Sequence, residues 1–421
     1  MQRYRILDQV IASNDEGLQA LLLYAHSLHE PCWCLCQHGE EHKLYIARRG
    51  DLYVLARWPG TGALHAAHCD HYEAPDFLTG MGEVRGRAIV EDEVEGITDV
   101  RLAFPLARGS ARAAPSAITN DKPSIKSTPQ KLSMRGLLHY LWDKAQLTHW
   151  HPKMEGKRNW YIVRRELLRA ASECRAKGDT LASRLFIPEE IDEKHTPAQL
   201  RQILARREAK LRPARISRNA ILIVIGDVAS ITRARFGEDI VLDHLEDLKF
   251  RLDEDMARRF YKRFALDLHL WDSYGDRGHL VMAASFSMDQ AGLPELLEIA
   301  LMPLTDQWLP FENLDERHLL EQAVADQRHF VKGMRVNLAS DVPIASLSLT
   351  DTGDRATAVY LASAKGEPAY DDALDALMQT QGIGHTLWQH GDELPAPVIR
   401  NNVTPIRPTD PPDPRPGSTI G

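Results

Sequence analysis

The spacing of apolar residues changes from one segment of the chain to the next, and each change of spacing predicts a change of secondary structure. Residues 4–28 place apolar side chains at roughly helical spacing, which predicts an amphipathic helix. Residues 43–57 alternate on either side of the turn Arg48–Asp51, a pattern typical of a β-hairpin. Two more strand-like runs lie within residues 86–106. We therefore expect residues 1–107 to form a β-rich N-terminal domain.

The rest of the chain changes pattern several more times. Residues 108–130 are rich in Ala, Ser, Thr, Pro and Lys and have few large apolar side chains, so they predict a flexible linker. Residues 131–215 carry apolar stripes at helical spacing, which predict a separate helical unit. Residues 216–392 alternate apolar strand-like runs with helical segments, which predicts an α/β domain. Residues 393–421 are dense in proline and predict a disordered tail.

The expected fold class is therefore α+β and multi-domain, with a β-rich N-terminal domain, a helical middle and an α/β C-terminal domain. Within the last domain we expect strands at Ile221–Ile225, His279–Phe286 and Thr357–Ala362, and helices at Asp253–Phe264, Leu293–Met302 and Glu316–Val331.

Composition limits the classes of protein to which the chain can belong. The 421 residues are 43% apolar and 26% charged, which is enough material for two or three ordinary cores. The first residues lack the pattern of a signal peptide, and the longest apolar runs fall far short of a membrane span, so we expect a cytoplasmic protein that is not in a membrane. Four of the five cysteines lie in the first 70 residues, which favours a thiolate site over a disulfide scaffold.

Cysteine and histidine are concentrated in two short segments, Cys32–Cys36 and His65–His71. Thiolate and imidazole are preferred zinc ligands, and a closed tetrahedral site needs four of them. We expect Cys34 and Cys36 to bind one Zn²⁺ from a tight knuckle. His65 and Cys69 would complete the site from one face of a helical turn. Three thiolates and one imidazole fill all four positions of a tetrahedral site and leave none for water, so the predicted role of the zinc is structural.

Several ligand assignments remain open at this stage. Cys32 could replace Cys34, and either His68 or His71 could replace His65, because each lies within the same short segment. These residues could also be free cysteines and solvated histidines, since C-x-C with H-x-x-x-C is less specific than paired C-x-x-C motifs.

The Cys-x-Cys segment, the hairpin and Arg57–Gly62 leading into His65 and Cys69 together resemble an uncharacterised bacterial family, domain of unknown function 1173. The resemblance extends to about residue 395. That family is described by three cysteines near the N-terminus, which correspond here to Cys34, Cys36 and Cys69. It implies no activity, but it supports these three cysteines as ligands.

Positive charge is concentrated in residues 131–215. This segment holds 19 Lys or Arg against 10 Asp or Glu, a net of +9, so the rest of a chain of net charge −8 sums to −17. Cations and aromatic residues alternate here as nucleic-acid contacts would require, and the order of helix, turn and helix resembles a winged-helix module. We expect DNA or RNA to contact Lys157, Arg158, Trp160, Arg164 and Arg165. Alternatively, the cations form a solvated helix face and the aromatic residues belong to the core.

Enzyme motifs are weak. Residues 330–392 resemble the strand-turn-strand core of restriction-endonuclease-like folds, but Ile344 and Ala358 stand where metal-binding carboxylates would be needed. We find no Gly-rich Lys loop, G-x-S-x-G elbow or H-E-x-x-H helix. The preferred interpretation is a zinc-stabilised, nucleic-acid-associated protein without an evident catalytic site. The alternatives are a metal-dependent nuclease or phosphodiesterase, and a protein-interaction scaffold.

Overall fold

The structure is a computed structural model, and it describes residues 2–49, 51–92, 96–108, 129–217, 219–235, 237–362, 368–379 and 383–398. The predicted linker, apart from its ends, and the predicted tail from residue 399 lie outside the described residues. The helices are α1 Leu18–Ser27, α2 Met81–Val84, α3 Met134–Lys144, α4 Trp160–Ser172, α5 Leu181–Arg184, α6 Pro197–Ile216, α7 Glu254–Arg263, α8 Ala265–Tyr274, α9 Leu314–Ala325 and α10 Pro368–Met378. In the described part of the chain, no helix is long and apolar enough to cross a membrane.

The N-terminal region is a five-stranded antiparallel sheet in the order β2-β1-β3-β4-β5. Its strands are β1 Arg3–Ile6, β2 Gln9–Ala12, β3 Cys32–Gln37, β4 Glu40–Arg49 and β5 Leu52–Arg57. The predicted hairpin is confirmed as β4 and β5. The helix predicted over residues 4–28 is wrong in its first half, because Tyr4 and Ile6 alternate into the core as strand residues while Val10 is 60% exposed. Only α1 remains helical.

A small second sheet follows in the order β10-β9-β7-β6. Its strands are β6 Ile89–Asp92, β7 Ile97–Val100, β9 Cys174–Ala176 and β10 Asp179–Thr180. The pairing of β7 with β9 is parallel and joins two segments more than 70 residues apart in the chain. Two strands, β6 and β7, lie within residues 86–106 as expected, but β7 ends at Val100, so the apolar run Val100–Phe104 lies almost wholly beyond it. β7 pairs with a strand of the middle segment.

A closed barrel of five strands occupies residues 222–304. Its strands are β12 Leu222–Arg233, β13 Glu238–Leu242, β14 Phe250–Leu252, β15 His279–Met288 and β16 Pro294–Leu304. The pairings run β12-β13-β14-β16-β15, and β15 closes the barrel by pairing with the first half of β12. Only the β14–β16 pair is parallel. Helices α7 and α8 connect β14 to β15.

One helix predicted for this region is a strand. All residues of the predicted helix Leu293–Met302 except Leu293 lie in β16, which pairs with β15 along its whole length. The segment carries apolar residues at helical spacing (Leu293, Leu296, Leu297, Ala300 and Leu301), but its pairing with β15 overrides this local pattern. The expected strands at Ile221–Ile225 and His279–Phe286 and the helix at Asp253–Phe264 correspond to β12, β15 and α7.

The C-terminal sheet has the order β20-β19-β18-β17-β8. Its strands are β8 His149–Trp150, β17 Phe330–Lys332, β18 Leu347–Leu349, β19 Thr357–Leu361 and β20 Gly384–Trp388. The helix predicted to reach Val331 ends at Ala325, because Gln327 takes a left-handed backbone with φ of 54° and the chain then enters β17. Ile344 and Ala358, where a nuclease would need carboxylates, are both buried, and Ala358 belongs to a small apolar cluster.

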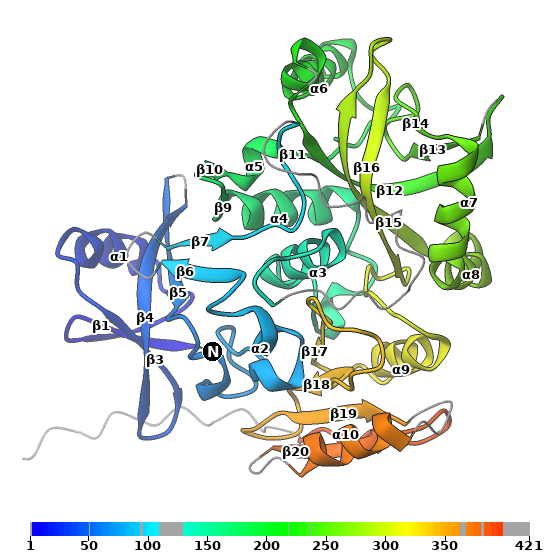
Figure 1. The fold of residues 1–421 in the computed structure, drawn as a ribbon. Helices are drawn as coiled ribbons and strands as arrows, with labels where there is room; N and C mark the ends of the chain where they lie inside the picture. Colours follow the sequence, from blue (N-terminus) through cyan, green and yellow to red (C-terminus); the bar gives the residue numbers. More distant parts are fainter. Residues whose placement is uncertain are drawn as a thin grey trace, which may run out of the picture.

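The structure does not confirm a winged-helix-like unit in the middle segment, residues 131–215. Its short strands β8, β9 and β11 Leu185–Phe186 pair with β17, β7 and β12, all outside the segment. Helices α3 and α4 lie at the centre of the molecule, with the N-terminal sheet on one side and the barrel on the other (Figure 1). Their apolar faces belong to a core that runs from Met81 to Val336. The independent folding of the segments 1–107, 131–215 and 216–392 stays a prediction.

Candidate functional site

Two separate pieces of chain bring the cysteine and histidine residues together. Cys34 and Cys36 lie two residues apart on β3, so their side chains point to the same face of the strand. His65 and Cys69 come from the loop after the 3₁₀-helix Gly62–Leu64. The helical turn predicted for them is wrong, because His65 has an extended backbone (φ −71°, ψ 154°) and a tight turn with Cys69 N bonded to Ala66 O at 2.8 Å follows.

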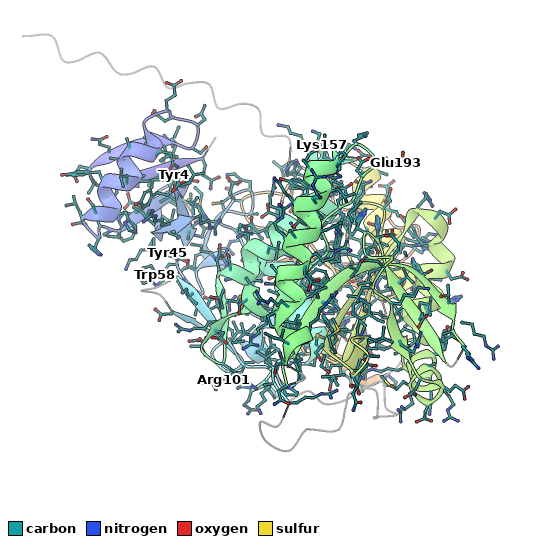
Figure 2. The ribbon with its side chains drawn as sticks, turned by 90° about the horizontal axis from the view of Figure 1, so that it is seen from above. Tyr4, Tyr45, Trp58, Arg101, Lys157 and Glu193 are labelled. Atoms are coloured by element: carbon teal, nitrogen blue, oxygen red, sulfur yellow. The ribbon has the colours of Figure 1, made fainter. Side chains whose placement is uncertain are left out.

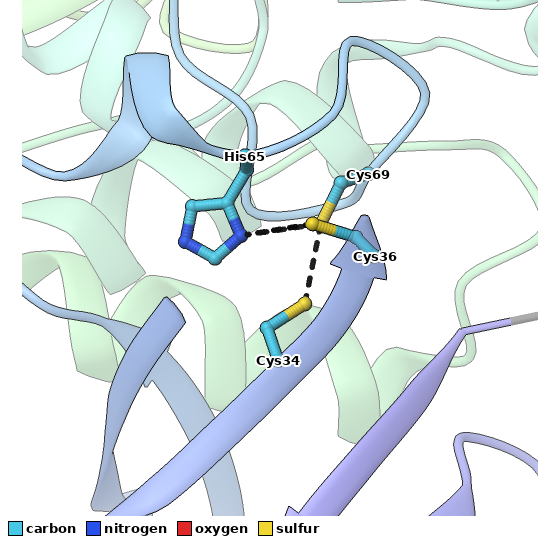
Figure 3. Close-up of side chains that lie close together, drawn as sticks. All are labelled: Cys34, Cys36, His65 and Cys69. Carbon is cyan, nitrogen blue, oxygen red and sulfur yellow. Dashed lines mark hydrogen bonds between the residues drawn. The ribbon is translucent and has the colours of Figure 1, made fainter. Parts of the chain in front are cut away.

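The four side chains converge on one point (Figure 3). The Cys34 and Cys69 sulfurs are 3.6 Å apart, and His65 Nδ1 lies 3.6 Å from the sulfurs of both Cys36 and Cys69. All four ligand atoms lie within 4.8 Å of one another. Zinc–sulfur bonds of about 2.3 Å and zinc–nitrogen bonds of about 2.0 Å place tetrahedral ligands roughly 3.5–3.8 Å apart. The group can therefore hold a metal ion, and the separations suit zinc.

The surroundings also suit a metal bound by thiolates. Backbone amides donate to two of the sulfurs, Ala66 N to Cys36 Sγ at 3.3 Å and His71 N to Cys69 Sγ at 3.4 Å. Such second-shell donors hold ligands in place and disperse thiolate charge. Hydrogen bonds among the three thiols hold the pKa of Cys36 well below its ordinary value and raise the pKa of Cys34 and Cys69, so Cys36 is the thiol that ionises first. A thiol that ionises readily is already prepared to bind a cation.

The other candidate ligands lie outside this group. Cys32 is on the same strand and fully buried in the apolar core of the N-terminal sheet, and burial raises the pKa of its thiol to about 11. His68 is exposed. The His71 ring packs beside that of His65, with centroids 5.5 Å apart, but its nitrogens are not among the converging ligand atoms. Among the described residues, the structure places only this one group of His, Cys, Asp or Glu suitably for a metal.

The five residues expected to contact nucleic acid divide into two sets. Arg158 donates to the carbonyl oxygens of Leu147, at 2.7 Å, and His149, and its guanidinium lies 5.4 Å from the Trp150 ring centroid. Trp160 is 5% exposed and donates from Nε1 to Pro188 O at 2.8 Å. Trp160 belongs to the core, as the alternative interpretation expects, whereas Arg158 binds backbone carbonyls within the fold and forms no solvated face. Contact of either residue with nucleic acid stays a prediction.

The remaining three residues reach the surface to different degrees. Arg164 is partly buried, donates to Ile187 O at 3.0 Å and pairs with Glu189 at 3.3 Å. The Arg165 side chain is 54% exposed and pairs with its neighbour Glu166. Lys157 is exposed, and Figure 2 shows it at the same edge of the molecule as Glu193. Lys157 and Arg165 are therefore the members of the set that a ligand could reach.

The buried position of Arg158 leads to a stability prediction. We expect Arg158→Ala to lower the free energy of unfolding by about 2–3 kcal/mol, because two carbonyl groups lose their donor and Trp150 loses its cation. The exposed neighbour Lys157 is the matched control, and Lys157→Ala should change stability by no more than about 0.5 kcal/mol. Urea unfolding of both variants measures the difference. Equal stability of the two variants would contradict a structural role for Arg158.

A polar cavity of about 450 Å³ adjoins the metal centre. It is lined on one side by β4, β5 and the loop that follows Cys69, and on the other by α3, α4 and their neighbours. Glu73 accepts from Arg57 at 2.8 Å and Arg85 at 3.4 Å. Asp143 accepts from Thr148 Oγ1 at 3.1 Å. Sequence reasoning missed this site, because its members are spread over segments with no common motif spacing.

The two acids in this cavity differ in protonation. Burial, reinforced by the negative charge of Glu73, raises the pKa of Asp143 to about 7. Glu73 is half-buried, and the Arg57 and Arg85 guanidiniums outweigh its desolvation and lower its pKa. Near neutral pH, Asp143 can therefore donate a hydrogen bond while Glu73 only accepts. Such a divergent pair is common at functional sites, though ion-pair networks also produce it.

The raised pKa of Asp143 makes stability depend on pH. Between about pH 4 and pH 7 the folded chain holds a proton that the unfolded chain has lost, so this group destabilises the fold progressively as pH rises. Asp143→Asn removes the effect. Relative to the wild type, the variant should gain roughly 1–3 kcal/mol between pH 5 and pH 8. Urea unfolding of both proteins across this range measures the gain, and parallel stability curves would contradict it.

Comparison with known proteins finds one match. Residues 4–391 match the model of a family described as a protein of unknown function (DUF1173). This range includes all four residues of the metal centre. No curated protein and no solved structure matches the chain.

Proposed function

The chain belongs to the DUF1173 family, whose description states no activity, and from that premise we propose that it is a zinc-stabilised protein that associates with single-stranded nucleic acid. The zinc part rests on the converging side chains of Cys34, Cys36, His65 and Cys69. Four protein ligands leave no position for substrate or water, so the zinc is structural. It would join β3 to the loop at 65–69, and so add folding energy to a sheet with a small core.

Metal analysis tests the zinc part directly. Protein purified without added metal should contain about one equivalent of zinc per chain, and a strong chelator should remove it with a loss of N-terminal structure. Elemental analysis gives the stoichiometry, and hydrogen exchange of the β3 and β4 amides reports the loss of structure. Protein that is fully folded and free of any metal would refute a structural zinc.

The five-stranded barrel carries the nucleic-acid part of the proposal. Its strand order, its single parallel pair between the third and fifth strands, and the helices between the third and fourth strands are those of an oligonucleotide/oligosaccharide-binding fold. Barrels of this type bind single strands across the second and third strands and the adjoining loops. The shared topology supports nucleic-acid binding only by analogy of fold, so the argument for binding depends on the side chains of that face.

Three cations lie on or beside the corresponding face. Arg233 ends β12, Arg251 lies on β14 and Lys249 precedes β14, and all three side chains are exposed. Arg251 pairs with Asp239 across the strands at 3.1 Å. Lys157 and Arg165 provide a second basic surface on the middle segment, which as a whole is strongly cationic. Either surface could contact phosphates, and charge alone does not discriminate between them.

Oligonucleotide binding with two sets of variants tests this part. Fluorescence anisotropy with a labelled single strand should show affinity that falls steeply with salt, and each lost phosphate contact should reduce the log–log slope by about 0.7. We expect the larger reduction for Arg233→Gln, Lys249→Gln and Arg251→Gln combined. A smaller reduction is expected for Lys157→Gln with Arg165→Gln.

The control removes the same kind of charge elsewhere. Arg87 and Arg101 are exposed, lie outside both surfaces, and are changed together to glutamine. An equal loss in this control would indicate that charge acts non-specifically. The absence of salt-sensitive binding in the wild type would reject nucleic-acid association altogether.

A further inference from the structure

The two faces of the N-terminal sheet are covered differently. Helix α1 packs against β1, β4 and β5, and the face beneath it contributes Tyr4, Ile6 and Leu44 to a buried apolar cluster. Side chains alternate along a strand, so the residues between these point to the opposite face. In the described part of the chain, Val10 and Trp33 on that face belong to none of the buried apolar clusters. The sheet therefore leaves apolar side chains accessible there, as interaction surfaces do.

A row of four residues crosses this opposite face. Arg5 on β1 stands directly opposite Trp33 on β3, which stands opposite Lys43 on β4. Trp58 directly follows β5, and Lys43 Nζ lies 3.6 Å from the Trp58 ring centroid. Cation and indole therefore alternate across the sheet, and we call these four residues the Trp row. Its two indoles stand two strand spacings apart, about 9.5 Å at the backbone.

The Trp row is accessible and includes a cation without an acidic partner. All four side chains are half-buried, and Figure 2 shows Trp58 beside Tyr45, whose ring centroid lies 6.3 Å away. Arg5 already pairs with Glu41 at 2.9 Å. Lys43 contacts the Trp58 ring but, among the described residues, no carboxylate. Aromatic-lined surfaces of this kind bind polyproline II segments, and the lysine adds a preference for an acidic one.

The C-terminal tail, which lies outside the described residues, has a matching period in its sequence. Proline recurs at every third position, at Pro405, Pro408, Pro411 and Pro414. A polyproline II helix has three residues per turn and rises about 3.1 Å per residue, so it places such prolines on one edge, roughly 9.3 Å apart. This spacing matches that of the two indoles. Asp410 and Asp413 each lie between two of these prolines, as Lys43 lies between the two rings.

The tail starts close to the N-terminal region. The amide of Val398, the last described residue, donates to Asp351 O at 2.8 Å. Three residues further along, Asp354 O accepts from Ala67 N at 3.0 Å, in the loop at 65–69 that carries two ligands of the metal centre. The 13 residues after Val398, up to Pro411, span at most about 45 Å. Five strands measure only about 24 Å across, so the tail can pass around the sheet to its opposite face.

We propose that residues 405–414 bind across the Trp row as a polyproline II helix. Two of the periodic prolines pack against Trp33 and Trp58, and one aspartate pairs with Lys43. The contact lies within one chain and involves neither of the basic surfaces considered for nucleic acid, so it is independent of nucleic-acid binding. A single strand of nucleic acid would also stack on the indoles. The tail is favoured, because both its proline period and the position of its acids match the row.

A peptide of residues 403–416 tests the docking by competition in the full chain. Pro408→Ala with Pro411→Ala should release the tail, so this variant should bind the peptide saturably in calorimetric titration. The wild-type chain should bind the peptide about tenfold more weakly, because its own tail competes at an effective concentration on the order of millimolar. A peptide with the same two substitutions is the matched control and should bind neither chain. Equal affinity of the two chains for the unaltered peptide would overturn the proposal.

Substitutions in the Trp row locate the contact. Added to the variant with the released tail, Trp33→Ala and Trp58→Ala should each weaken peptide binding by about fivefold or more. Tyr24→Ala, at a side chain 57% exposed on α1, should leave the affinity unchanged. Circular dichroism and metal content show whether each variant is folded. If Trp33→Ala unfolds the sheet, Lys43→Gln keeps both rings and should weaken binding by about threefold, an effect that high salt removes.

Two further results would overturn the proposal. One is peptide binding that both indole variants leave intact, since the peptide would then bind elsewhere. The other is the absence of peptide binding to the variant with the released tail. If a single-stranded thymidine oligonucleotide binds that variant instead, and Trp33→Ala removes this binding, the Trp row is a surface for nucleic acid and not for the tail.

Discussion

Cys69→Ser is expected to lower the zinc content from about one equivalent to nearly none and to unfold the loop that carries His65. Cys69 is in contact with two of its co-ligands, since its sulfur lies 3.6 Å from both Cys34 Sγ and His65 Nδ1. A serine hydroxyl is a much poorer zinc ligand than a thiolate. The free energy of unfolding of the N-terminal region should fall by about 3 kcal/mol or more. Elemental analysis and hydrogen exchange measure the two effects.

Cys32→Ser is the matched control for this prediction. Cys32 lies on β3 like Cys34, and both are fully buried, but only Cys34 belongs to the converging group. The control variant should keep its metal and lose only the stability that a buried hydroxyl costs, roughly 1–2 kcal/mol. Full zinc content in Cys69→Ser would refute the ligand assignment. Loss of zinc in Cys32→Ser but not in Cys34→Ser would show that Cys32 is the ligand instead.

Glu316→Gln is expected to lower the free energy of unfolding by about 3–5 kcal/mol, because it leaves the Lys332 ammonium buried without its counter-ion. The two side chains are 5% and 3% exposed, and Lys332 Nζ lies 2.9 Å from Glu316 Oε1. Glu316 also accepts a hydrogen bond from the backbone amide of Glu312 at 2.7 Å. The pair therefore joins α9 to β17 within the core. Urea unfolding measures the loss.

Two comparisons make this second prediction specific. Lys194→Gln disrupts an exposed pair with Asp192 and should change stability by less than about 0.5 kcal/mol. Adding Lys332→Met to Glu316→Gln should recover part of the loss, since removing both buried charges is less costly than removing one. A double variant less stable than Glu316→Gln would indicate that Lys332 acts mainly through packing or through its bond to Gly333 O.

The candidate metal centre could be foreseen because its chemistry is local. Cysteine and histidine are rare enough that two short segments holding seven of them carry a signal independent of packing. The β4–β5 hairpin was equally accessible, since the turn and the alternation lie within 15 residues. The choice of Cys34 over Cys32 was left open, because both residues occupy the same face of β3 and only the position of the loop at 65–69 separates them.

The roles of charged and aromatic residues could not be read from the chain in the same way. Arg158 and Trp160 satisfy the pattern of a nucleic-acid contact, yet both complete hydrogen bonds inside the fold. A cation next to an aromatic residue looks the same in sequence whether it faces solvent or backbone carbonyls. Glu73 and Asp143 were missed for the opposite reason, because nothing in the sequence distinguishes them from other acidic residues. Their pKa values diverge only through burial and neighbouring charges in the fold.

Contacts between distant residues decided whether an apolar segment forms a helix or a strand and which strand it pairs with. β16 was expected as a helix, and its strand character follows from the pairing with β15 that closes the barrel. The parallel pair of β14 and β16, which defines the topology, joins strands separated by two helices. Local sequence therefore determined the cysteine and histidine cluster, the hairpin and several helices, since these rest on chemical identity or a short period. The closed barrel, the shared central core and the polar cavity were decided by long-range pairing and burial, which no local pattern encodes.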